Sequence, residues 1–347
     1  AIRPGKETFE SVLEAGLGKT IYRDFYLPYS HKIWGLKPDD LSKEQASRRV
    51  SSNSTGKMFL KVLSALPGIK KPQGNGRFYY PLKGFGQICE SLSHDAKEKG
   101  ANIILGASFK SLLLGGKRAR SVTYVQDNKT YSVEADFIWS TIPNTLLIQS
   151  IQPSPPPAVI DASRKLKFRS MILVYLTLNQ KRFTEYDAHY FPEASIPVTR
   201  LSEPKNYCNV STPENSTVLC AELPCFTTSP EWEMQDIELG ELVKQCLDKV
   251  ELTVKKPIEK VVTKRLKYAY PIYKREYDRY LDEIERYLDQ TENVLSFGRQ
   301  GLFAHDNTHH ALSMAYSAVA CFNKEEGFDS TKWKKFRKVF ETYVVVD

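Results

Sequence analysis

The sequence lacks the patterns that identify several large classes of protein. Its longest apolar run, Met171–Leu178, is far shorter than the ~20 residues that a membrane-spanning helix needs. None of the six cysteines forms a C-x-x-C pair, and their spacing matches no zinc pattern. There is no P-loop, no H-E-x-x-H and no Gly-rich G-x-G-x-x-G. We therefore expect no bound metal and no transmembrane segment.

The chain also begins at Ala1 rather than at a methionine, and it carries no signal-peptide segment. Reduced, buried thiols in a cytoplasmic protein are then the simplest reading of the cysteines.

The composition is that of an ordinary globular protein. The chain has 347 residues, of which 41% are hydrophobic and 26% charged, which suits two domains. Residues 1–120 hold 21 basic against 10 acidic side chains, a bias that suits nucleic acid, an anionic membrane surface or a phosphate-bearing ligand. Because no arginine-rich run or nucleic-acid motif is present, we expect no nucleic-acid partner. Peripheral membrane contact and the oligomeric state stay open.

Hydrophobic periodicity predicts a mixture of helices and strands. The expected helices are 8–27, about 42–50 (capped by Ser42), one that follows the break at Gly84 and Gly86 and runs to about Glu98, 234–250, 277–288, 307–321 and about 330–342. The expected strands are 77–82, 101–105, 130–133, 137–140, 171–178, 258–268 and 293–297, with a hairpin formed by 108–114 and 120–126. In the helix that ends near Glu98, the residues expected to face inward are Phe85, Ile88, Cys89, Leu92 and Ala96. The pattern indicates an α/β or α+β composite rather than a simple doubly wound sheet.

The strongest local signal for a ligand site follows the strand at 293–297. That strand runs directly into Gly298, Arg299 and Gly301, and a helix then begins at Asn307 or Thr308. Glycine permits close approach of the backbone to a ligand, and a helix N-terminus presents unpaired N–H groups. The segment therefore suits a phosphate or an electron-rich ring carbonyl, although an ordinary strand–loop–helix connection explains the same pattern.

The segment from His305 to His310 gathers three histidines and an aspartate. Histidine and carboxylate are common metal ligands. Adjacent histidines on a helix point in different directions, however, so a helix cap with exposed or pocket-lining imidazoles is the favoured interpretation.

Several stretches, taken in order, resemble one family of proteins. Tyr79–Gly86 is similar to a "YPxGGxGxL" turn, Ala135–Pro143 to an "AD-x-V-x-S-T-x-P" strand end, and Gly298–His310 to a "GRxGxxxYNNxDH" motif. These are motifs of FAD-dependent amine-oxidase-like flavoproteins. Phe25–Leu36 and the region from Tyr190 to Cys225 resemble the protoporphyrinogen-oxidase-like and UDP-galactopyranose-mutase-like branch. The resemblance spans about Phe9 to Cys321.

The resemblance implies an FAD cofactor and a small-molecule substrate. It places Gly298, Arg299 and Gly301 near the FAD diphosphate or ribityl chain, and Asn307, Thr308 and His309 near the flavin ring. It also places Phe109 along the adenine, and Ser140, Thr141 and Pro143 near the cofactor. The catalytic residues are unknown; Tyr270, Tyr273 and Arg265 are possible pocket residues, although core or surface roles are favoured for each.

Two features depart from the family pattern. The acidic residue of the family stands where this chain has His309, and the G-x-G-x-x-G unit with which the family begins is missing. We therefore expect an N-terminally truncated chain, inactive by itself.

The resemblance implies a two-domain flavoprotein fold with an incomplete Rossmann-like domain and a mixed-sheet substrate domain. Residues 1–76 would form the helical part of the substrate domain and 151–290 its main sheet. Residues 77–150 and 291–347 would belong to the FAD domain. The implied function is an FAD-dependent oxidoreductase. The alternatives are a flavin-dependent isomerase like UDP-galactopyranose mutase and a cofactor-free, non-enzymatic remnant.

Overall fold

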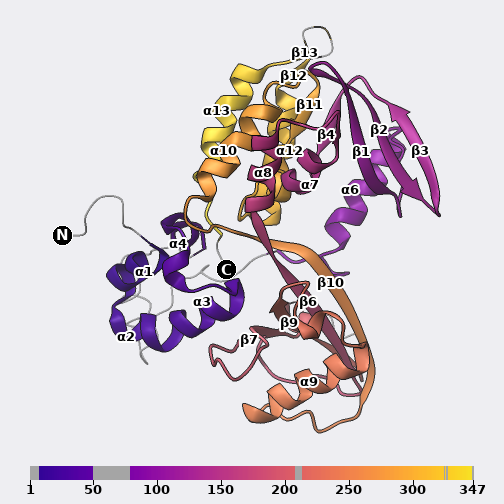
Figure 1. The fold of residues 1–347 in the computed structure, drawn as a ribbon. Coiled ribbons are helices and arrows are strands. Elements are labelled where there is room, and N and C mark those ends of the chain that lie inside the picture. The colour runs from indigo at the N-terminus through magenta and orange to yellow at the C-terminus, as the bar shows by residue number, and fades with distance from the viewer. Residues whose placement is uncertain (1–7, 50–78, 208–212, 324, 326, 346–347) are drawn as a thin grey trace.

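A computed structural model describes residues 8–49, 79–207, 213–323, 325 and 327–345. Figure 1 shows small helices at the N-terminal end, a long antiparallel sheet below, and a layer of helices and short strands above. A further antiparallel sheet stands to one side of that upper layer. No helix within these described ranges is both long and apolar enough to cross a membrane.

The N-terminal helices follow from caps and breaks in the sequence. They are α1 (Phe9–Leu17), α2 (Lys19–Ile21), a π-helical turn (Tyr22–Tyr26), α3 (Leu27–Trp34) and α4 (Lys43–Arg49). Thr8 and Ser11 form a capping box at the start of α1. Gly18, with φ 85°, interrupts the predicted 8–27 helix. Helix α3 was not predicted, although Pro28 at its start and Gly35 at its left-handed end are both typical helix boundaries.

Helix α3 is anchored to the lower part of the molecule by Lys32. Its Nζ donates hydrogen bonds to the main-chain oxygens of Glu193 (2.9 Å) and Ile196 (2.7 Å). Further carbonyls of this loop, those of Phe191 and Val198, also accept from it. One ammonium group thus gathers the chain from 191 to 198 against α3.

The lower sheet is antiparallel, with the strand order β10-β6-β9-β8-β7. Its strands are β6 (Lys167–Leu178), β7 (Ala188–Tyr190), β8 (Arg200–Ser202), β9 (Thr217–Cys225) and β10 (Ile258–Ile272). Alternate residues of β6, such as Ile172, Val174 and Leu176, are fully buried in a core that also includes Leu239 and Val243 of α9 (Asp236–Lys249). The other face of β6 is half-buried, so the prediction that this strand is covered on both faces holds fully for one face only.

The upper layer contains the remaining sheets. One has the order β3-β2-β1-β5, formed by β1 (Ser108–Gly115), β2 (Arg118–Gln126), β3 (Lys129–Glu134) and β5 (Ile151–Gln152). Another pairs β4 (Ile138–Ser140) in parallel with β11 (Val294–Ser296), and a third pairs β12 (Phe322–Asn323) with β13 (Gly327–Phe328). The helices here are α6 (Gln87–Glu98), α7 (Asn144–Gln149), α8 (Pro157–Lys165), α10 (Tyr277–Leu288), α11 (Gly298–Gly301), α12 (Thr308–Ala320) and α13 (Ser330–Phe340).

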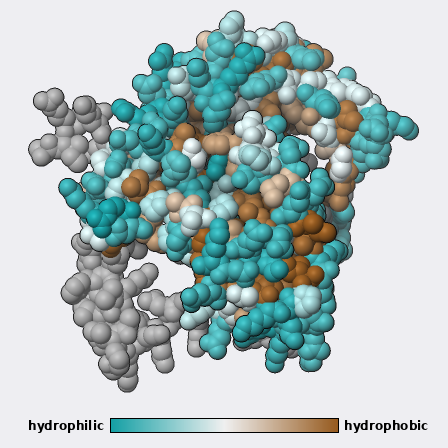
Figure 2. All heavy atoms as spheres, turned by 60° about the horizontal axis from the view of Figure 1, so that its bottom comes forward, coloured by the Kyte–Doolittle hydropathy of each residue, from teal (hydrophilic) through white to brown (hydrophobic). Residues whose placement is uncertain are grey.

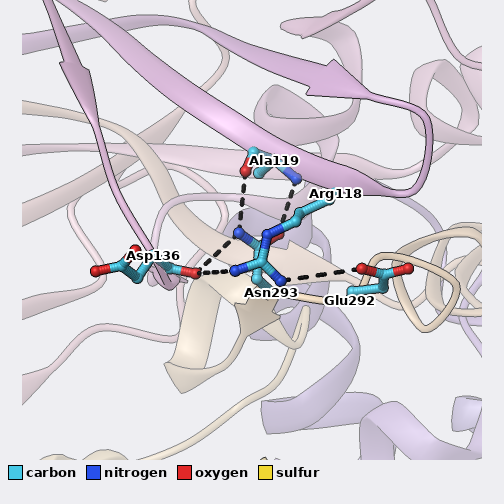
Figure 3. A network of polar contacts seen from close by, with 5 residues as sticks. All are labelled: Arg118, Ala119, Asp136, Glu292 and Asn293. Atoms are coloured by element: carbon cyan, nitrogen blue, oxygen red, sulfur yellow. Dashed lines mark hydrogen bonds and ion pairs between the residues drawn. The ribbon is translucent and has the colours of Figure 1, made fainter. Parts of the chain in front are cut away.

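Asn293 joins the hairpin β1–β2 to the parallel pair β4–β11 (Figure 3). Its side chain, almost fully buried, accepts a hydrogen bond from Ala119 N (2.7 Å) and donates to the oxygens of Ala119 and Asp136 (each 3.0 Å). Arg118 reaches the same Asp136 oxygen at 3.3 Å and lies 3.9 Å from Glu292. The start of β11 is therefore fixed by side-chain bonds to two other strand segments.

Some predicted elements differ from the structure. Residues 101–105 and the described part of 77–82 are not strands; residues 77–78 lie outside the described residues. Helix α6 forms where predicted and ends before Gly100, but none of its residues is buried. Ser42 precedes α4 as expected, yet its Oγ makes no hydrogen bond within the described ranges, so it does not act as a cap there. The reason for the missing strands and for the uncovered helix is that periodicity indicates which side of a segment is apolar but not whether a partner covers it.

The surface reflects this uneven coverage. On the face shown in Figure 2, hydrophobic residues gather on one side, whereas most of the remaining surface is hydrophilic. Large apolar side chains exposed in and beside α6 are Leu82, Phe85, Leu92, Ile104 and Leu105.

Candidate functional site

Strands β4 and β11 end side by side and bring the two predicted ligand-binding segments together. Ile138 pairs with Val294, and Ser140 pairs with Ser296, in parallel register. In open parallel sheets, ligands bind outside the carboxyl ends of the strands. The segments that follow, residues 141–143 and 297–301, therefore lie at the edge where a ligand site is expected.

The two glycines after β11 are required by this geometry. Gly298 has φ 79°, and a Cβ there would meet only Thr141 side-chain atoms, the nearest at 3.7 Å. At Gly301 a Cβ would lie 3.0 Å from Ser296 Oγ and 3.2 Å from Ser140 O. Gly298 thus provides a conformation that other residues rarely adopt, and Gly301 permits close packing of α11 on the strand ends.

Two side chains at this edge have polar atoms without hydrogen-bond partners among the described residues. Both Ser140 Oγ and the amide of Asn144 are buried, Asn144 with 1% of its surface exposed, and neither side chain makes a hydrogen bond. Buried polar groups are nearly always paired, and leaving one unpaired costs about 1–3 kcal/mol. Residues 141–143 lie between Ser140 and Asn144 in sequence, and Pro143 is the residue at which α7 begins. Donors and acceptors supplied by a ligand fit this arrangement.

The N-terminus of α12 forms the next part of the site. Asn307 and His310 make a capping box: the side chain of Asn307 accepts from the N–H of His310, and His310 Nδ1 accepts from the N–H of Asn307 at 3.2 Å. Thr308 and His309 occupy the first turn and are exposed. The free N–H groups of a first turn favour negative charge or electron-rich oxygen.

Arg299 is bound to the last residues of β10. Its Nη2 donates to Ala269 O at 2.8 Å, and its guanidinium lies 4.9 Å from the centre of the Tyr270 ring. The adjacent Gln300 donates to Tyr268 O at 2.7 Å. Arg299 and Gln300 thus connect the loop after β11 to the end of β10.

His305 is fully buried and is surrounded by aromatic side chains. Its ring is 5.3 Å from Trp34 and 4.8 Å from Tyr273, centre to centre. Gln45 Oε1 accepts from Tyr273 N at 3.0 Å, so the amide nitrogen of Gln45 is the atom that lies 3.1 Å from His305 Nε2. An amide nitrogen can only donate, and His305 Nε2 must therefore accept, which places the imidazole proton on Nδ1.

Asp306 is the most unusual ionisable group of the site. Its side chain has no exposed surface, and neither carboxylate oxygen accepts a hydrogen bond among the described residues. Burial raises its pKa to about 6, although Arg48, Arg299 and His309 oppose the shift. A carboxyl group in this state exchanges a proton close to neutral pH.

The other predicted residues lie elsewhere or have structural roles. Phe109 belongs to β1, where it is paired with Tyr124 and packs against the core of the upper layer. Tyr273 is buried and stacks on Tyr277 at 4.2 Å, and burial raises its pKa to about 12. Arg265 donates to Trp232 O at 2.8 Å and is exposed. Tyr273 and Arg265 thus have the core and surface roles that the sequence favoured.

A cavity of about 340 Å³ adjoins the site between β11, α10 and α13. Ser296 and Gly301 line it together with Glu285 and Arg337, whose side chains form an ion pair at 2.6 Å. No cluster of three or more histidine, cysteine, aspartate or glutamate side chains suited to a metal occurs in the described ranges.

Sequence reasoning missed Gln45, Asn144 and Asn293. Gln45 stands in a polar helical segment and gives no signal of being fully buried. Asn144 directly follows Pro143, and an amide at a helix start after a strand end is a signal that could have been used. Asn293 was included only as the first residue of a strand.

Comparison with known proteins supports the fold. No protein-family profile and no curated protein sequence matches the chain. Among solved structures, a reduced UDP-galactopyranose mutase aligns with a TM-score of 0.76 and 18% identity, covering 100% of this chain and 74% of the mutase. A protein described as a protoporphyrinogen oxidase, from Exiguobacterium sp. 255-15, aligns with a TM-score of 0.59 and 18% identity, covering 85% of this chain. This chain spans 63% of that protein's length. The predicted fold class, an α+β composite, is confirmed by the structure and by these likenesses in fold.

Proposed function

We propose that the chain acts as an FAD-dependent oxidoreductase that takes a hydride from a small organic substrate. The proposal rests on one observation. Strands β4 and β11 end side by side next to Gly298, and at this place Ser140 Oγ and the Asn144 amide have no hydrogen-bond partner among the described residues. Buried polar atoms of this kind suit a polar ligand. The fold, which is shared with a UDP-galactopyranose mutase and a protein described as a protoporphyrinogen oxidase, also supports the proposal.

In this proposal the residues divide into two groups. Ser140, Thr141, Gly298 and Asn144 would contact the cofactor at the strand ends, and the first turn of α12, Thr308 and His309, would face an electron-rich edge of it. FAD, when bound, supplies the hydride-accepting ring. The chain itself supplies close backbone approach at Gly298 and a partial positive charge at α12.

The decisive experiment separates ligand binding from folding by means of Asn144. FAD is added to the purified chain, and binding is followed by flavin fluorescence and visible absorption. Asn144→Leu removes unsatisfied polar atoms, so the unliganded variant should be at least as stable as the wild type in urea. The same change should weaken FAD binding about tenfold, the loss of one or two hydrogen bonds.

A matched control is Asn179→Leu, at an exposed position directly after β6 in the lower sheet, which should leave binding unchanged. If Asn144→Leu is destabilising and FAD affinity is unaltered, the amide has a structural role and the proposed placement is wrong. If neither the wild-type chain nor a version extended at its N-terminus binds FAD, the cofactor-free alternative replaces the proposal.

A second candidate function is isomerisation of a nucleotide sugar. The higher TM-score of the UDP-galactopyranose mutase, together with coverage of the whole chain, is the observation in its favour. Chemically reduced, FAD-loaded protein incubated with UDP-galactopyranose would then produce the furanose isomer. Absence of that product, with reduction of the flavin by a small-molecule donor, favours the oxidoreductase.

A further inference from the structure

Strands β4 and β11 form a parallel sheet of only two strands within the described residues. Each of the two strands is three residues long. Parallel strands are normally part of larger sheets that are covered on both faces. A sheet of two strands has two outer edges, and the main-chain N–H and C=O groups along each edge require hydrogen-bond partners.

The hydrogen bonds between the two strands show which main-chain groups face outward. Ile138 N donates to Asn293 O at 2.8 Å, and Phe297 N donates to Ser140 O at 3.0 Å. Ile138 and Ser140 therefore direct their main-chain groups toward β11. Because these groups alternate in direction along a strand, the N–H and C=O of Trp139 point to the other side. No strand among the described residues pairs with that side of β4.

The outer edge of β11 is closed by two helices. By the same alternation, Val294 and Ser296 direct their main-chain groups away from β4. Both residues line the cavity that is bounded by α10 and α13, and the ion pair between Glu285 and Arg337 crosses from one helix to the other. Val294 is 8% exposed. This edge thus faces the interior of the upper layer, and the helices exclude a further strand from it.

The outer edge of β4 is open by comparison. Phe137 and Ile138 are half-buried, and Trp139 is 37% exposed, although all three are apolar. Side chains of consecutive strand residues point to opposite faces, so exposure of all three indicates that cover is missing along the edge rather than over one face. The Trp139 ring is held in place by Phe297, 5.7 Å away between ring centres. The open edge is therefore an ordered surface.

Apolar side chains of neighbouring elements are also left without cover. Tyr131 and Val133 of β3 are exposed, as are Phe85 and Leu92 in and beside α6. Figure 1 shows β3 and α6 on the same side of the molecule. The alignment with the UDP-galactopyranose mutase covers 100% of this chain and 74% of the mutase, so part of that fold has no counterpart here. Both observations favour a further segment of the same protein as the cover.

We propose that the outer edge of β4 pairs with a third parallel strand, which is supplied by a segment of this protein outside residues 1–347. The strand accepts a hydrogen bond from Trp139 N–H and donates one to Trp139 O. It is apolar, because strands inside parallel sheets are covered on both faces. Its carboxyl end lies beside Ser140 and Thr141, at the edge of the candidate ligand site. A role of the following turn in cofactor binding rests on the proposed function, whereas the pairing with Trp139 does not.

The first test is hydrogen exchange at single residues. It compares the 347-residue chain with versions extended by the adjoining coding sequence at the N-terminus and at the C-terminus. In the 347-residue chain we expect Ile138 N–H to be protected and Trp139 N–H to exchange freely. In one extended version Trp139 N–H should exchange at least about 100-fold more slowly. Free exchange of Trp139 in both extended versions, protection already in the 347-residue chain, or the absence of adjoining coding sequence at both ends overturns the proposal.

The second test uses proline, which removes one N–H group. Trp139→Pro and the control Trp139→Ala should unfold at the same urea concentration in the 347-residue chain, because neither loses a main-chain bond to β11. In the extended protein, Trp139→Pro should unfold at a lower urea concentration than Trp139→Ala. Equal midpoints there contradict pairing through Trp139.

Measurement of FAD binding by the same extended protein separates this proposal from the proposed function. Protection of Trp139 without FAD binding supports the third strand and contradicts the proposed function. FAD binding without protection of Trp139 does the reverse.

Discussion

Gln45 and His305 lie 260 residues apart in sequence, with Gln45 Nε2 3.1 Å from His305 Nε2, both side chains being fully buried. The contact joins helix α4 near the N-terminus to the loop before α12, and Gln45 also accepts from the main chain of Tyr273. One amide thereby links three segments and determines the tautomer of a histidine at the edge of the candidate site.

Replacement of Gln45 should disturb all three segments. Gln45→Ala leaves Tyr273 N–H and His305 Nε2 without their partner in a buried environment, so we expect a loss of about 2–4 kcal/mol in the free energy of unfolding. Urea denaturation measures it. Gln290→Ala, at an exposed position, is the matched control and should change stability by less than about 0.5 kcal/mol. Equal, small effects at both positions would show that the Gln45 contact is not formed.

Gly35 allows Arg169 to cap helix α3. Arg169, buried, donates to Ile33 O at 2.9 Å and to Lys32 O at 3.1 Å, and its guanidinium lies 4.2 Å from the centre of the Phe226 ring. Gly35 has φ 67°, and a Cβ there would be 2.6 Å from Phe226 and 2.8 Å from Arg169.

Alanine substitutions at two glycines separate the cost of backbone strain from the cost of steric overlap with neighbouring side chains. Gly35→Ala adds both a left-handed backbone penalty and a steric overlap, and should cost about 2–4 kcal/mol. Gly116→Ala, with a similar φ of 70° but no atom within 4 Å, should incur only the backbone penalty of about 1–2 kcal/mol. Thermal or urea unfolding compares them. A loss at Gly116 as large as that at Gly35 would refute the role of the Arg169 and Phe226 contacts.

Replacement of Asn293 should lower the stability of the protein more than its position at the start of a strand suggests. Asn293→Ala removes three hydrogen bonds that connect β11 to the β2 and β4 segments, with an expected loss of about 2–4 kcal/mol. Hydrogen exchange should show faster exchange at Ala119, whose N–H loses its acceptor. Asn102→Ala, exposed, serves as control. Unchanged protection at Ala119 would contradict the network in Figure 3.

Much of the fold could be predicted because local patterns repeat over several residues. The hairpin β1–β2, the helix Tyr277–Leu288 and the strand Val294–Ser296 all form close to their predicted bounds. The fold shared with the UDP-galactopyranose mutase could also be predicted, because the glycines after β11 and the start of α12 occur in a fixed order. These features depend on residues near one another in sequence.

Features that depend on distant partners could not be predicted. Helix α6 has an apolar side, yet Phe85 and Leu92 stay exposed because no described element buries them. Residues 101–105 have strand-like composition but no strand partner in the described ranges. Conversely, Gln45 is buried by contacts made hundreds of residues away. The predicted site residues Ser140, Thr141 and Gly298 do lie together at the strand ends. The importance of Asn144 and Asp306 is recognised only in the structure, where their polar atoms have no hydrogen-bond partner among the described residues.

The buried carboxyl of Asp306 should make the stability of the protein depend on pH. Its pKa is about 6 in the folded protein against 3.8 for the ordinary group, so the folded state binds more protons between about pH 4 and pH 6. The contribution of Asp306 to the free energy of unfolding is fully present below about pH 4 and is lost as the pH rises from there through 6. The loss amounts to about 3 kcal/mol at neutral pH, at 1.36 kcal/mol for each pKa unit.

Asp306→Asn cannot ionise, and it should be more stable than the wild type at pH 7.5 but not at pH 4.5. Urea unfolding of both proteins at the two pH values measures the difference. An equal difference at both pH values would mean that Asp306 is already ionised at pH 4.5 in the folded protein.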